Sequence, residues 1–126
     1  MILSLYKHLK KIADSEYSDI VEGSEIIFTY SGRARKLRIK IIDNTFIDIW
    51  YSLEGEYSFH WEQSVRNTFY RHDNAPHKKW SFVKTFPKHC HDRTQDNVTE
   101  SNLSKIPDEA LREFLDIVRK RMVNPE

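Results

Sequence analysis

Hydrophobic residues recur every three or four positions at both ends of the chain. Near the N-terminus this spacing predicts an amphipathic helix over residues 2–13, with lysines on its outer face. Near the C-terminus, Pro107-Asp108-Glu109 is typical of a helix start, because proline fits the first turn and acids complement the helix dipole. The apolar stripe of this second helix consists of Leu111, Phe114, Leu115, Val118 and Met122.

Between the two helices, apolar and polar residues alternate, which is typical of strands. Five strands are predicted, over residues 26–30, 35–42, 45–53, 56–63 and 67–72. Ser31-Gly32, Asp43-Asn44 and Glu54-Gly55 suit turns between them, and such short turns join antiparallel neighbours. Residues 80–86 suit a sixth strand or an ordered loop, and shorter extended pieces are indicated near 20–21 and 98.

The predicted fold is therefore α+β, an antiparallel five- to six-stranded meander sheet flanked by an N-terminal and a C-terminal helix. One face of the sheet needs cover from the helices, and its residues are Leu37, Ile39, Ile47, Ile49, Phe59 and Trp61. The opposite face carries Lys36, Arg38, Lys40 and His60. The two lysines and the arginine form either a solvated face or a track for nucleic-acid phosphates.

Length and composition fit a single domain over residues 1–126. The formal net charge is only +1, and the one cysteine, Cys90, cannot form an internal disulfide. The N-terminus does not resemble a signal peptide, and no apolar run is long enough for a membrane span. We therefore expect a cytoplasmic protein with no membrane association.

Five of the six histidines fall between His60 and Arg93, a segment with a net charge of +4. Two clusters stand out there, residues 71–77 (RHDNAPH) and residues 86–91 (FPKHCH). Each contains a proline, which stiffens the backbone. Titratable side chains on stiff loops beside a scaffold are typical of a functional site, which we expect in residues 70–93.

A metal-independent ribonuclease is the leading hypothesis for this site, with no cofactor and no metal. RNA cleavage by the adjacent 2′-hydroxyl needs a base, an acid and a cation, and histidine fills either proton-transfer role near neutral pH. The candidate catalytic residues are His72, His77, His89, His91, Arg71 and Asp73. The candidate nucleic-acid-binding residues are Lys36, Arg38, Lys40, His60, Tyr70, Lys79 and Lys88.

Three alternatives stay open. The His89-Cys90-His91 run and His72-x4-His77 offer metal ligands, with Asp73 adding oxygen, although the spacing is unspecific. Cys90 is also a candidate nucleophile between two histidines, although a lone cysteine is more often a small buried residue. Finally, the protein can be a module that binds nucleic acid or a partner without catalysis.

The motifs from Tyr57 to Trp61, Tyr70 to His77 and Thr85 to His91 resemble those of the TumE family. The resemblance covers roughly residues 25–120. The family pattern R-x-D-N-x-P-H matches residues 71–77, and F-P-H-H-x-H matches residues 86–91 except at Lys88, where a histidine is frequent.

This resemblance implies a toxin of a bacterial or archaeal type II toxin–antitoxin pair. Its partners would be RNA and a cognate antitoxin protein, and a homodimer is left open. In the acid–base hypothesis, the four histidines transfer protons or bind phosphate, Arg71 holds a phosphate and Asp73 orients a histidine. This hypothesis requires the imidazoles of residues 72, 77, 89 and 91 to share one cleft.

Overall fold

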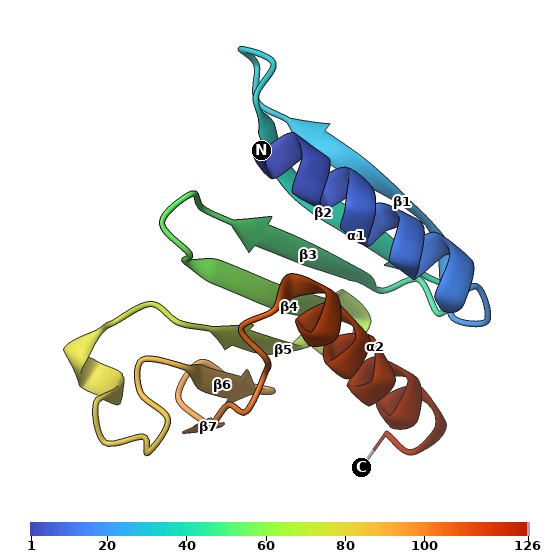
Figure 1. Cartoon of the computed structure of the whole chain (residues 1–126). Helices are drawn as coiled ribbons and strands as arrows, with labels where there is room; N and C mark the ends of the chain where they lie inside the picture. The colour runs from blue at the N-terminus through green and yellow to red at the C-terminus, as the bar shows by residue number, and fades with distance from the viewer. Residues whose placement is uncertain (126) are drawn as a thin grey trace.

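The chain folds into a seven-stranded antiparallel sheet with two helices packed on one of its faces (Figure 1). The structure is a computed structural model and describes residues 1–125. The helices are α1 (Ile2–Glu16) and α2 (Pro107–Val123). The strands, adjacent in sequence order, are β1 (Val21–Phe28), β2 (Ala34–Ile41), β3 (Phe46–Tyr51), β4 (Tyr57–Gln63), β5 (Thr68–Asp73), β6 (His89–Asp92) and β7 (Val98–Glu100).

The predicted α+β class and the antiparallel meander between two helices are confirmed, but the sheet has seven strands rather than five to six. Residues 80–86 do not form a strand. Instead, the chain makes a short 3₁₀ helix at Lys78–Trp80 and a series of turns, and the sixth strand is His89–Asp92. The extended piece near residue 98 is β7, and the piece near residue 20 joins the first predicted strand to form β1.

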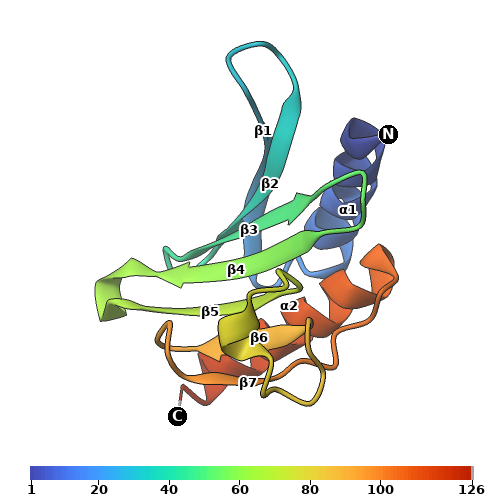
Figure 2. The same ribbon diagram turned by 90° about the vertical axis from the view of Figure 1, so that its left-hand side faces the viewer.

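Both helices cover the same face of the sheet, as the view turned by 90° shows (Figure 2). Helix α1 packs against β1 and β2. The Tyr6 hydroxyl donates to the Arg35 carbonyl at 3.1 Å and accepts from the Tyr51 amide at 3.0 Å, so it links α1 to β2 and β3. Within residues 1–125, neither helix is long and apolar enough to cross a membrane.

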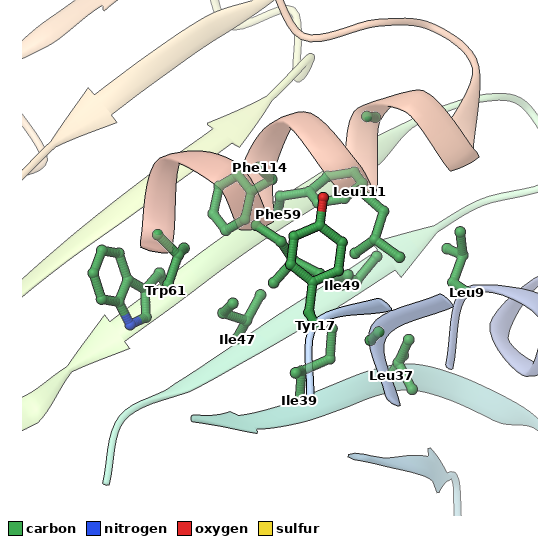
Figure 3. Close-up of a cluster of buried hydrophobic side chains, with 14 of the residues drawn as sticks. Leu9, Tyr17, Leu37, Ile39, Ile47, Ile49, Phe59, Trp61, Leu111 and Phe114 are labelled. Atoms are coloured by element: carbon green, nitrogen blue, oxygen red, sulfur yellow. The ribbon is translucent and has the colours of Figure 1, made fainter. Parts of the chain in front are cut away.

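The core lies between the helices and the sheet, and it contains the predicted residues Leu37, Ile39, Ile47, Ile49, Phe59 and Trp61 (Figure 3). Phe114 of α2 packs against the centre of the sheet. Its ring centroid lies 5.5 Å from that of Phe59 and 5.7 Å from that of Tyr70. This packing joins α2 to β4 and β5, and it therefore holds the end of the sheet that carries the histidines.

Two of the predicted turns use glycine in a conformation that other residues seldom adopt. Gly32 between β1 and β2 has φ 89°, and Gly55 between β3 and β4 has φ 91°. Gly55 also accepts a hydrogen bond at its carbonyl from the Asn74 side chain at 3.1 Å. The β3–β4 turn is thereby connected to the chain that leaves β5.

We predict that Phe114→Ala lowers the free energy of unfolding by about 3–5 kcal/mol, because it leaves a cavity between α2 and the sheet. Denaturant unfolding measures this change. Lys120→Ala, an exposed position on the same helix, is the matched control and should change stability by no more than about 0.5 kcal/mol. Equal effects of the two substitutions would contradict the role of Phe114.

Candidate functional site

The pairing of β5 with β6 sorts the candidate residues onto two faces of the sheet. Asp73 lies opposite His89, and Arg71 lies opposite His91. His72 lies opposite Cys90. Side chains alternate along a strand, and directly opposed residues share a face. Asp73, His89, Arg71 and His91 therefore lie together on one face. His72 and Cys90 lie on the other.

The face away from the helices gathers one carboxylate, two imidazoles and a guanidinium. Asp73 Oδ1 lies 3.2 Å from His89 Nε2, and Asp73 Oδ2 lies 3.8 Å from His91 Nε2. Arg71 Nε donates to Asp73 Oδ2 at 3.1 Å. We call these four residues the Asp–His cluster. Three of its members, Asp73, His89 and His91, each offer a ligand atom within 4.8 Å of the others, which is close enough to hold a metal ion.

Backbone carbonyls fix the orientation of both imidazoles in the Asp–His cluster. His89 Nδ1 lies 2.7 Å from the Pro87 carbonyl oxygen, and His91 Nδ1 lies 2.9 Å from the Gln95 carbonyl oxygen. A carbonyl oxygen only accepts, so each Nδ1 carries the hydrogen. In the neutral ring each Nε2 then has a lone pair, and both lone pairs are on the side of Asp73.

The loop that connects β5 to β6 covers the Asp–His cluster. Trp80 from this loop packs edge-on against the His91 ring, with centroids 5.4 Å apart. His89 and His91 are each only 1% exposed, and Asp73 is 8% exposed. The start of the loop is tied to the cluster, because the Ala75 amide donates to Asp73 Oδ1 at 3.0 Å. Burial lowers the pKa of His91, so this imidazole is neutral at pH 7.

A pocket of about 170 Å³ opens beside the Asp–His cluster. Its wall includes Arg71, Asp73, His77, His89 and His91, together with Trp50, Tyr57, Ser58, Ala75, Trp80 and Gln95. Drug-sized ligands occupy roughly 300–1,000 Å³, so this volume suits a phosphate group or a hydrated ion rather than a whole nucleotide. The structure therefore brings three of the four candidate histidines to one pocket.

His72 is the histidine that does not join this pocket. It lies on the helix side of β5, where Nδ1 is 2.6 Å from the Ser101 hydroxyl and Nε2 is 2.8 Å from the Tyr70 hydroxyl. Burial lowers the pKa of His72 to about 4, so the ring is neutral in the folded protein. The single cleft expected for all four imidazoles is thus not present, because successive residues of a strand face opposite ways.

Two other residues predicted to have functional roles also face the helices. Tyr70 is 6% exposed and stacks on Phe114, so its ring is not available to a nucleic-acid base. Cys90 is 3% exposed, and burial raises the pKa of its thiol. Because the thiolate is the reactive form, this environment is that of a structural cysteine rather than a nucleophile.

The three cations of β2 lie on the predicted face, but each has an acidic neighbour. Lys36 Nζ lies 2.8 Å from Asp48 Oδ2, and Arg38 donates two hydrogen bonds to the same carboxylate. Lys40 pairs with Glu25 at 3.2 Å. This arrangement favours the solvated, salt-bridged face over a free phosphate track.

The remaining candidates are His60, Lys79 and Lys88, and none of them lines the pocket. His60 bonds Glu62 at 2.9 Å, and its Nδ1 lies 3.4 Å from Arg71 Nη1. Lys79 is exposed and lies over the Trp80 ring. Lys88 lines a separate, larger hollow beside Phe86. Of these three side chains, His60 touches the Asp–His cluster, at Arg71, and within residues 1–125 neither lysine forms a hydrogen bond or ion pair with it.

Sequence reasoning missed several residues of the pocket wall, among them Trp50 and Gln95. Trp50 is 40% exposed on the polar face of β3, and an exposed tryptophan at that position was the available signal. Gln95 holds the cluster twice, because its side chain accepts from Arg71 at 2.8 Å and its carbonyl accepts from His91. It lies in a polar loop with no distinguishing pattern, so the sequence held no signal for it.

The family model described as Toxin TumE matches residues 8–122, which is most of the chain. No curated protein and no solved structure matches the chain significantly.

We predict that His72 makes the folded protein less stable as the pH falls from 6.5 to 4. Its folded pKa of about 4 lies below the ordinary value of 6.5, so the unfolded chain binds the extra proton in this window. The loss attributable to His72 is on the order of 3 kcal/mol. Urea unfolding at several pH values, compared with His72→Asn, measures it.

The wild-type protein should be more stable than His72→Asn at pH 7, and this advantage should shrink toward pH 4. The difference between the two proteins reports the titration of His72 together with that of its electrostatic neighbours Asp73 and Asp92. A difference that stays constant across the window would show that the imidazole is not held neutral.

Proposed function

The chain belongs to the TumE toxin family, and on that premise we propose that it is the toxin of a type II toxin–antitoxin pair that cleaves RNA at the Asp–His cluster. Its antitoxin is the partner that the family implies. The observation that carries the proposal is the meeting of Arg71 with buried imidazoles in one phosphate-sized pocket.

Arg71 is the phosphate-binding group in this proposal. Its guanidinium is oriented by Asp73, Gln95 and His60, and these contacts leave further N–H groups without an acceptor among residues 1–125. A planar fork held in this way suits the oxygens of a phosphodiester. A fixed cation also stabilises the charge that develops on the phosphate in the transition state.

The imidazoles supply the rest of the chemistry. His77 is exposed at the rim of the pocket, whereas His89 and His91 are buried in its wall. His77 is therefore able to exchange protons with the substrate and with solvent. The two buried imidazoles either transfer protons, as the sequence suggested, or hold a metal ion, and both chemistries need the same oriented Nε2 atoms.

A second hollow beside the pocket offers room for a neighbouring nucleotide. It has a volume of about 640 Å³ and is lined by Tyr51, Tyr57, Phe86, Pro87, Lys88 and Lys105, among others. Aromatic rings with nearby cations are typical of sites for single-stranded nucleic acids. Tyr57 lines both hollows, and its buried hydroxyl has no hydrogen-bond partner among residues 1–125.

We predict that purified protein cleaves single-stranded RNA and that Arg71→Ala lowers the cleavage rate by about 100-fold or more. The reason is the loss of a cation that binds the phosphate in the transition state. Gel analysis of RNA fragments measures the rate, and growth arrest on induction gives the matching readout in cells. His8→Ala is the control, since His8 is exposed and pairs with Asp108 on the helix side.

Two outcomes would count against the proposal. One is RNA that stays intact with the wild-type protein. The other is toxicity that survives Arg71→Ala but is lost in the triple variant Lys36→Ala/Arg38→Ala/Lys40→Ala. The second result would favour a toxin that acts by binding RNA or a partner without cleavage.

A further inference from the structure

Three hydrogen-bond acceptors converge in the Asp–His cluster. With hydrogen on each Nδ1, the Nε2 atoms of His89 and His91 present lone pairs toward a carboxylate. Arg71 and the Ala75 amide donate hydrogen bonds to the Asp73 oxygens. Among residues 1–125, no hydrogen bond joins these oxygens to either Nε2 atom. A lone pair that faces a carboxylate in a buried site is unfavourable, so a cation is needed between them, either a proton on Nε2 or a metal ion.

We propose that Asp73, His89 and His91 bind a divalent transition-metal ion such as Zn²⁺, through one carboxylate oxygen and the two Nε2 atoms. This ligand set consists of imidazole and carboxylate, which suits zinc and its neighbours in the first transition series. Calcium and magnesium prefer oxygen ligands alone.

The distances fit this ion. With zinc–ligand distances near 2.0–2.1 Å, two ligands at a tetrahedral angle are about 3.3 Å apart. The carboxylate oxygens lie 3.2 and 3.8 Å from the two Nε2 atoms, and one ligand atom from each of the three residues lies within 4.8 Å of the others. Small side-chain rotations are enough to close the set around an ion.

The surroundings are also those of a metal site. Zinc-binding histidines usually donate their other N–H to a carbonyl or carboxylate, which fixes the ring and its tautomer. Both imidazoles do so here, to the carbonyls of Pro87 and Gln95. The strand pairing and Trp80 hold the rings in place, and the ligands therefore need little reorganisation on binding.

Three protein ligands leave a coordination position free on the side of the pocket. Catalytic zinc sites have this arrangement, with water in the fourth position. The role of the ion in RNA cleavage rests on the function proposed above, but its binding does not. The proposal also replaces the metal-free chemistry suggested by the sequence, because an Nε2 atom that binds the ion cannot transfer a proton.

The test is a titration of the metal-free full chain with Co²⁺, which reports binding by its visible absorption. We expect one ion per chain, displaced by Zn²⁺. His91→Ala and Asp73→Asn should each weaken binding by more than about 100-fold, since losing a ligand costs more than losing an outer-shell partner. The control His8→Ala should bind like the wild type.

X-ray absorption of the zinc-loaded wild-type protein requires no variant and therefore covers the case in which a substitution prevents folding. The expected spectrum shows imidazole nitrogen and oxygen around zinc and no sulfur. Wild-type protein that binds no more Co²⁺ than His91→Ala, or a sulfur shell from Cys90, would overturn the proposal. Neither measurement uses RNA, so a protein that binds the ion without cleaving RNA would contradict the proposed function alone.

Discussion

Backbone hydrogen bonds between β5 and β6 hold Asp73 opposite His89 and Arg71 opposite His91. The side chains of a strand alternate, so this register decides which groups meet in the pocket and which meet the helices. A shift of β6 by one residue against β5 would bring Cys90 to the pocket and would turn His89 and His91 toward the helices, away from Asp73. The short β6 is stabilised on its other side by β7, and its two histidines bond the loop carbonyls of Pro87 and Gln95.

The two faces of β5 and β6 therefore give the same residue type opposite roles. On the helix side, His72 has a hydrogen-bond partner at each ring nitrogen and packs against Phe114, which makes it part of the core. On the other side, His89 and His91 have one partner each at Nδ1, and their Nε2 atoms face Asp73. A histidine with a free, oriented nitrogen is available for chemistry, whereas a fully bonded one stabilises the fold.

The sequence predicted the helices and the first five strands because their apolar residues follow the periods of those structures. Strand β6 was missed because its four residues, HCHD, have no apolar alternation, and pairing with β5 and β7 makes them a strand. The site was predicted as a segment, residues 70–93, without its division between the two faces of the sheet. The position of His72 on the helix side was not anticipated, because it depends on where β5 ends. The contact of Gln95 with the site was not anticipated either, because it depends on the path of an irregular loop.

The central claim is that both buried imidazoles carry hydrogen on Nδ1 and present Nε2 to Asp73. Long-range proton–nitrogen correlation spectra of the metal-free wild-type protein report the protonation of each ring nitrogen directly. The account predicts Nδ1–H tautomers for His89 and His91 at neutral pH, and a change of both Nε2 resonances on addition of Zn²⁺. An Nε2–H tautomer in either ring, or Nε2 resonances that do not respond to zinc, would contradict it.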